Sequence, residues 1–169
     1  MLMIALMAAI GLVAYLPQFV WGPRRDWRMP MRHGMAAVFL YTGSDHFLSL
    51  HERYVPMIPP YLADWAVELV LISGALELAG ALGLLLPLVV WRRLGWPNLR
   101  PVAGVGLAML LSVMVIANSH VAAAGGSIPG LPDSTLYYAT RPLFQPFIVL
   151  WALVCSGAVM PPRAADASR

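Results

Sequence analysis

The sequence has few charged residues for its length. Only 11% of its 169 residues are charged and 60% are hydrophobic, whereas about a quarter of the residues are charged in a typical water-soluble domain. This composition cannot cover a soluble surface of the required size with polar groups, which excludes an ordinary water-soluble globular domain. We therefore expect lipid to be the solvent around most of the chain.

The sequence also lacks lysine and has a single cysteine. All eleven basic residues are arginines, and they stand in short clusters between apolar runs. This placement is typical of signals for membrane topology and not of a nucleic-acid-binding surface. A lone cysteine, Cys155, excludes a Cys-x-x-Cys redox pair within this chain. Because Cys155 lies inside an apolar run, we interpret it as a packing residue.

Five apolar runs are long enough to predict membrane-spanning helices. They cover residues 2–20, 33–50, 63–90, 102–124 and 142–160, and residues 161–169 follow as a tail. The first run has no positively charged segment before it and no clear small-x-small cleavage site after it, so we expect a retained helix and not a secretion signal. The sequence predicts a single all-α membrane domain over residues 1–169.

The placement of the arginines predicts the orientation of the spans. With five alternating spans, only Arg53 and Arg141 fall on one side of the membrane. The other nine fall on the opposite side: Arg24, Arg25, Arg28, Arg32, Arg92, Arg93, Arg100, Arg163 and Arg169. Because loops rich in arginine stay in the cytoplasm, we expect the N-terminus outside and the tail in the cytoplasm.

Polar residues of the last four predicted spans lie at a similar depth, toward the outer face. A charged group at mid-membrane costs about 2.5–3.5 kcal/mol, so such groups normally face the bundle interior or water. We therefore predict a ligand pocket that faces outward. Its predicted lining residues are Asp45, His46, Glu68, Ser73, Glu77, Asn118, His120, Arg141 and Gln145.

Glu77 stands in the middle of the apolar stretch SGALELAGALGLLLP. The residues at 73, 74, 80 and 81, which share its helical face, are all small, and such a face indicates close contact with another helix. Glu68 lies on the opposite face of the same helix, so these two carboxylates do not form a pair. Two interpretations of Glu77 stay open: a neutral acid that fixes packing, or a group that accepts a proton or contacts substrate.

Other polar residues also leave alternatives open. Arg141 is expected to pair with either Asp45 or Glu68 across the bundle. A haem or metal bridge between His46 and His120 is conceivable, but hydrogen-bonded histidines are favoured, and we predict no metal site. The segments VPMIPPYLADW and GGSIPGLPDSTLYYATR are predicted as loops on the outer side, either simple connections or lids over the polar layer.

The order of several segments resembles a known family. These segments are GSDHFL, YVPMIPPYL, SGALELAGALGLLLP, GLAMLLSVMVIANSHVA and RPLFQPFIVLWAL. Together they resemble the DoxX and DoxX-like family of small bacterial membrane proteins from about Met35 to Leu153. The resemblance implies a four-helix transmembrane bundle formed by spans two to five, with the first span as an addition. It also implies a location in the bacterial inner membrane, and hence a periplasmic N-terminus.

The family suggests a role near redox chemistry. Some members are small membrane subunits of thiosulfate:quinone oxidoreductase, and others associate with thiol-handling proteins. The resemblance implies an accessory subunit beside a redox enzyme, with a pocket for a quinone or another small lipophilic ligand. Glu77 or Glu68 would then handle protons, and His46 or His120 would act as acid or base. The alternatives are a non-catalytic structural or assembly subunit and a b-type haem protein.

Overall fold

The computed structural model describes residues 2–21 and 26–159, with side chains at 4–16 and 26–159. Within these residues the chain is helical and contains no strand. This confirms the all-α prediction. The α-helices are α1 (Leu2–Trp21), α2 (Arg28–Leu48), α3 (Ala66–Leu85), α4 (Leu88–Arg93), α5 (Arg100–Ala123) and α6 (Thr135–Ser156).

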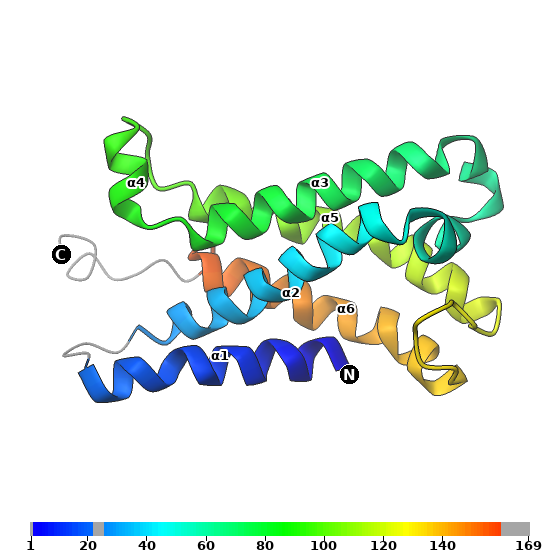
Figure 1. The fold of residues 1–169 in the computed structure, drawn as a ribbon, viewed down its shortest axis with the longest axis horizontal. Helices are drawn as coiled ribbons and strands as arrows, with labels where there is room; N and C mark the ends of the chain where they lie inside the picture. Colours follow the sequence, from blue (N-terminus) through cyan, green and yellow to red (C-terminus); the bar gives the residue numbers. More distant parts are fainter. Residues whose placement is uncertain (1, 22–25, 160–169) are drawn as a thin grey trace.

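The long helices run alternately in opposite directions along one axis (Figure 1). Helix α1 packs on α2, α2 on α3, α3 on α5, and α5 on α6, which returns to contact α2. One end of the molecule holds α4, the starts of α2 and α5 and the end of α6; we call it the α4 end. The opposite end, called the loop end, holds residues 49–65 and 124–134.

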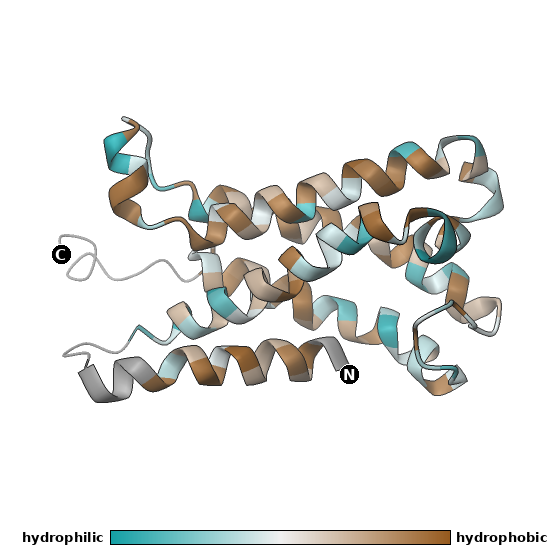
Figure 2. Ribbon diagram, in the orientation of Figure 1, coloured by the Kyte–Doolittle hydropathy of each residue, from teal (hydrophilic) through white to brown (hydrophobic). Residues whose placement is uncertain are grey.

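Three helical segments are long and apolar enough to cross a membrane: Pro60–Leu85, Arg100–Ala123 and Thr135–Ser156. They correspond to the last three predicted spans. Helix α2 is not among them, since it carries Arg28, Arg32 and Asp45 along its length. In α1, the apolar stretch with described side chains is Ile4–Leu16. Figure 2 shows hydrophobic residues along much of α3, with hydrophilic ones at the end of α4 and at the loop end.

The helices differ from the predicted spans at their ends. Residues 63–90 do not form one helix, because α3 ends at Leu85 and Pro87 precedes the separate helix α4. Helix α6 begins at Thr135 and not at 142, because Ser134 caps it by accepting a hydrogen bond from Tyr137 N. Helix α2 begins at Arg28 and ends at Leu48, so the predicted span 33–50 is displaced. The tail 161–169 lies outside the described residues.

The segment VPMIPPYLADW is not an irregular loop, in contrast to the prediction. A π-helical turn (Leu50–Tyr54) continues into two 3₁₀-helices, Val55–Met57 and Pro60–Trp65. Pro56 and Pro60 occupy first-turn positions, where a helix does not need the missing N–H group. The prolines therefore start short helical turns and do not prevent them.

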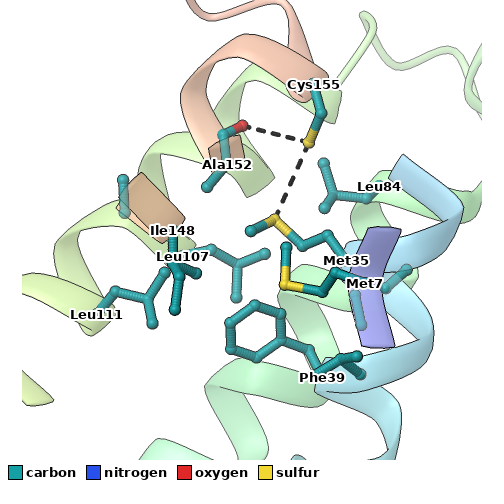
Figure 3. Packing of buried hydrophobic residues seen from close by; sticks show 13 residues of the cluster. Met7, Met35, Phe39, Leu84, Leu107, Leu111, Ile148, Ala152 and Cys155 are labelled. Atoms are coloured by element: carbon teal, nitrogen blue, oxygen red, sulfur yellow. Dashed lines mark hydrogen bonds between the residues drawn. The ribbon is translucent and has the colours of Figure 1, made fainter. Parts of the chain in front are cut away.

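The apolar core lies in the half of the bundle nearer the α4 end. Figure 3 shows its side chains pointing toward one another from α1, α2, α3, α5 and α6. Cys155 is fully buried there, with its Sγ 3.9 Å from the sulfur of Met35. Gly104 allows α5 to approach α6, since a Cβ at this position would meet Ser156 and the carbonyl oxygen of Ala152. Small residues thus hold the long helices in close contact.

Candidate functional site

Glu77 faces α2 across a close contact between α2 and α3. Gly43 and Gly74 form this contact, because a Cβ on Gly74 would lie 2.6 Å from the Cβ of His46 and 3.1 Å from Gly43 O. The side chain of Glu77 is 2% exposed, and its Oε2 lies 2.5 Å from the hydroxyl oxygen of Thr42. The two glycines therefore bring a buried carboxyl group into hydrogen-bonding contact with the neighbouring helix.

The hydrogen bonds around Thr42 indicate where the proton lies. Its hydroxyl oxygen lies within reach of both Glu77 Oε2 and the carbonyl oxygen of Val38, the latter at 3.1 Å. A hydroxyl has a single hydrogen, and a carbonyl oxygen can only accept. Both contacts are satisfied when a protonated Glu77 donates to Thr42 and Thr42 donates to Val38. The geometry therefore favours a neutral glutamic acid.

His46 is the second buried polar group of this wall. Its Nδ1 lies 2.8 Å from the carbonyl oxygen of Thr42, so Nδ1 carries a hydrogen and donates it. In the neutral ring, Nε2 is then the acceptor. The imidazole stacks on Tyr54, with ring centroids 3.9 Å apart, and its Nδ1 lies 3.9 Å from Glu77 Oε2. Stacking and the backbone hydrogen bond thus fix both the orientation and the tautomer of His46.

Asp45 is paired with Arg53, and neither of the predicted pairings of Arg141 is present in the structure. Asp45 Oδ2 accepts from Arg53 Nη1 and, at 3.0 Å, from the hydroxyl of Tyr54, while Oδ1 accepts from Ser49. Burial, and then the charge of Asp45 and its hydrogen bond, raise the pKa of Tyr54 well above its ordinary value, so the phenol keeps its proton. The carboxylate of Asp45 therefore accepts three hydrogen bonds, all from residues just after α2.

The opposite wall is formed by α5 and α6. Asn118 Nδ2 donates to Gln145 Oε1 at 3.1 Å, and Gln145 Nε2 donates to the carbonyl oxygen of Leu111 at 2.8 Å. The guanidinium of Arg141 lies 5.6 Å from the ring centroid of Tyr137, within cation–π range. Its Nη1 is buried and has no hydrogen-bond partner among the described residues. Arg141 therefore presents an unused donor beside the two amides.

A cavity of about 290 Å³ separates these walls. Ligand pockets usually measure about 300–1,000 Å³, so this cavity suits a small molecule. The apolar part of its lining comes from residues such as Val38, Phe39 and Ile148. The polar lining groups are Tyr41, Thr42, Asp45, His46, Arg53, Tyr54, Glu77, Asn118, Tyr137, Arg141 and Gln145.

The loop end of the cavity is covered by two connecting segments. Residues 130–132 and Arg53 both line the cavity, and Arg53 Nε donates to the carbonyl oxygen of Pro129 at 3.1 Å. Leu6 and Tyr41 also line the cavity, although they are 42% and 66% exposed. The cavity therefore reaches the surface on the flank of the bundle, beside the start of α1.

Three predicted pocket residues lie elsewhere. Glu68 is exposed on the far face of α3, as its helical spacing from Glu77 requires. The hydroxyl of Ser73 donates a hydrogen bond to the carbonyl oxygen of Val70 in its own helix, at 2.9 Å. His120 is half-buried but is not part of the cavity lining, so the structure does not place it with His46 around one ligand position.

Five polar lining residues were missed by the sequence analysis: Tyr41, Thr42, Arg53, Tyr54 and Tyr137. Thr42 is a mid-helix hydroxyl, and only its spacing of four residues from His46 indicates that both share one face. Arg53 and Tyr54 follow the end of α2, where the sequence indicates only a connection. The π-helical turn that directs them back over the cavity has no clear sequence signal. Within the described residues, no group of three or more His, Cys, Asp or Glu side chains could hold a metal ion.

Comparison with known proteins gives a family but no activity. No curated protein and no solved structure gives a significant match to this chain. One family model matches residues 35–156, from the middle of α2 to the end of α6, and so covers all the polar lining groups of the cavity. Since this match spans more than half of the sequence, the chain belongs to DUF8561, a family described as a domain of unknown function.

Proposed function

We propose that this chain is a DoxX-like, multi-pass protein of the bacterial inner membrane. In this proposal α2, α3, α5 and α6 form a four-helix transmembrane bundle, and α1 is an additional span. The described arginines support the orientation, because Arg28, Arg32, Arg92, Arg93 and Arg100 belong to the α4 end. Arg53 and Arg141 belong to the loop end. The α4 end would then face the cytoplasm and the loop end the periplasm.

The cavity would bind a small lipophilic molecule with hydrogen-bonding oxygens, such as a quinone or quinol. The observation that carries this proposal is the contrast between its apolar lining and the polar groups on its two walls. Glu77, His46 and Thr42 lie on one wall, and Arg141 and Gln145 on the other. Such an arrangement can hold one oxygen of a ring at each wall, while aliphatic side chains surround the ring.

The ligand would enter from the bilayer. The covered loop end and the exposed lining residues Leu6 and Tyr41 favour a route along the flank. Helix α1 runs antiparallel to α2, with Met7 O against Gly34. Beside Leu6 and Tyr41 the cavity would face the space that lipid fills. A molecule dissolved in the membrane could enter there without crossing the polar segments at the loop end.

The side chains would bind the ligand and exchange protons with it. A protonated Glu77 has one hydrogen, which it can donate either to Thr42 or, in its place, to a ligand oxygen. The Nε2 of a neutral His46 can accept a hydroxyl proton. The unused Nη1 of Arg141 can donate to the second oxygen. Electron transfer would belong to a redox-enzyme partner subunit, so the proposed role of this chain is that of an accessory subunit.

The experiment compares matched pairs of variants on the same helices. We expect Glu77→Leu to weaken binding of a short-chain benzoquinone, measured by equilibrium dialysis, by about tenfold, the loss of one hydrogen bond to a ligand. Glu68→Leu removes the same group from the exposed face of α3 and should leave binding unchanged. In a second pair, His46→Ala should weaken quinone binding and His120→Ala should leave it unchanged, because only His46 lines the cavity. Equal effects within both pairs, or no binding by the folded parent protein, would contradict the proposal.

A structural or assembly subunit is the second candidate. The bond from Asn118 to Gln145 and the contact of Thr42 with Glu77 join neighbouring helices, as polar groups do when they fix packing in membranes. In that case Glu77→Leu and His46→Ala would change the unfolding temperature, and quinone binding would be absent in every variant. A haem protein is a weaker alternative because His120 is not part of the cavity lining; an absorption spectrum of the purified protein tests it.

A further inference from the structure

A second concentration of polar groups lies at the α4 end, away from the cavity. Arg28 and Arg32 come from the first turns of α2 and are only 9% and 8% exposed. Arg100 is the first residue of α5 and is half-buried. Electrostatic interactions connect Arg100 with Arg32 and with Asp26, and Asp26 with both arginines of α2. We call Arg28, Arg32 and Arg100 the arginine cluster.

The arginine cluster carries more positive charge than its protein partners neutralise. Asp26 Oδ2 accepts from Arg32 Nη2 at 2.8 Å, and Arg32 Nη1 lies 3.4 Å from the carbonyl oxygen of Cys155. Burial raises the pKa of Asp26, but the hydrogen bond and charge of Arg32, together with Arg28, outweigh it and lower the pKa, so the carboxylate is ionised. Among the described residues, this one negative charge stands against three positive charges.

Two of the three guanidinium groups have unused donors. The Nε atoms of Arg28 and Arg100 are buried and find no hydrogen-bond partner within the described part of the chain. A buried donor that bonds neither protein nor water costs free energy comparable to a lost hydrogen bond. These two atoms can therefore donate to an acceptor from outside the described residues.

The helix termini add to the positive potential. Helices α2 and α5 both begin at the arginine cluster, and neither has an acidic residue in its first turn. Each first N–H already has an acceptor, since Arg28 N donates to Asp26 Oδ1 and Arg100 N to Asn98 Oδ1. The N-terminus of a helix carries a partial positive charge and favours anions. Trp91 and Trp96, stacked with ring centroids 6.3 Å apart, lie on and just after α4 at the same end. Tryptophan is enriched at the level of lipid headgroups.

We propose that the arginine cluster binds a phosphate group, supplied either by an anionic phospholipid of the cytoplasmic leaflet or by free phosphate. A phosphate offers several acceptor oxygens to three guanidinium groups that share the single carboxylate of Asp26. It would accept from the unused Nε atoms and offset the excess charge. Because this site lies at the opposite end from the cavity, it does not depend on quinone binding.

The test uses the full-length protein in detergent and native mass spectrometry. We expect the parent protein to retain phosphatidylglycerol in preference to phosphatidylcholine. In the double variant Arg28→Gln/Arg100→Gln, the retained phosphatidylglycerol should fall by on the order of tenfold, the effect of two basic contacts to an anionic lipid. The control Arg92→Gln/Arg93→Gln removes the same charge from exposed positions at the same end and should change retention by less than about twofold.

Further arms identify the source of the phosphate and guard against misfolding. If millimolar inorganic phosphate binds to the parent protein and displaces phosphatidylglycerol, the ligand is free phosphate; if it does not, the ligand is the lipid. Arg28→Lys/Arg100→Lys keeps the charge and should keep most of the retention, which separates loss of binding from loss of folding. Equal losses in the two glutamine double variants, or no preference for phosphatidylglycerol and no binding of phosphate by the parent protein, would overturn the proposal.

Discussion

The two halves of the bundle use the same helices in different ways. Toward the α4 end, large apolar side chains such as Phe39, Leu84 and Leu107 are fully buried and fill the space between helices. Toward the loop end, the same helices leave a cavity of about 290 Å³ lined in part by buried polar groups. A smaller apolar cluster of Met57, Val121, Ile128 and Tyr138 also packs at the loop end. The comparison indicates that packing at both ends holds the helices together and allows a cavity with buried polar groups to persist between them.

The largest expected effect comes from breaking the packed half. Gly104→Ala would place a Cβ against Ser156 and within 2.8 Å of the carbonyl oxygen of Ala152, so α5 and α6 must separate. We expect a loss of about 3 kcal/mol, at the upper end of overpacking costs. Gly106→Ala is the control on the same helix, because a Cβ there meets nothing within 4 Å. Thermal unfolding in detergent measures both, and equal stability of the two variants would contradict the described packing.

The next effect concerns the segments that cover the cavity. Arg53→Ala removes the ion pair with Asp45 and the hydrogen bond to Pro129 O. We expect a loss of about 2 kcal/mol, typical of hydrogen bonds to charged groups. Hydrogen exchange should become faster in residues 124–134 but not in the packed half. His51→Ala, an exposed change in the same π-helical turn, should leave this exchange unchanged.

A smaller effect is expected from Asp26 at the α4 end. Its pKa is lowered in the folded state, since Arg32 and Arg28 together outweigh the effect of burial. Because the folded-state pKa is lowered, the ionised carboxylate stabilises the folded state at every pH above its ordinary pKa of 3.8. This contribution is lost as the pH falls through the folded-state pKa. The half-exposed carboxylate should contribute less than about 1 kcal/mol. The unfolding temperatures of the parent and Asp26→Asn should differ at neutral pH and converge in acid; a constant difference would disprove the link.

The smallest expected effect tests how strongly the polar half ties its helices. Asn118 and Gln145 share one hydrogen bond between α5 and α6. Such bonds inside membranes contribute on average about 0.6 kcal/mol in double-mutant cycles. A cycle of Asn118→Ala and Gln145→Ala should therefore give a coupling energy near that value. A coupling energy of several kcal/mol would mean that the polar wall, and not the apolar core, holds the bundle together.

Much of the fold could be predicted from the sequence, but less of the site. Long apolar runs predicted the three helices that are long enough to cross a membrane, because hydropathy depends on composition alone. The ends of two of these helices differ from the prediction, because Pro87 separates α4 from α3 and Ser134 caps the start of α6. The apolar runs do not show such local effects at helix termini. Six of the nine predicted pocket residues line the cavity, since an up-and-down topology brings residues of equal depth to the same layer. Glu68, Ser73 and His120 belong to the same layer, but their side chains do not line the cavity.

The sequence by itself determined that the fold is all-α, which three segments are apolar enough to cross a membrane, and how far along these helices their polar groups lie, because these properties follow from hydropathy and helical rise. The tertiary structure alone decided which polar groups meet. Thr42 meets Glu77 because Gly43 and Gly74 let two helices approach, and Arg53 reaches Asp45 because the chain turns back after α2. Such contacts depend on the rotation and spacing of whole helices, which the packing of the entire bundle sets.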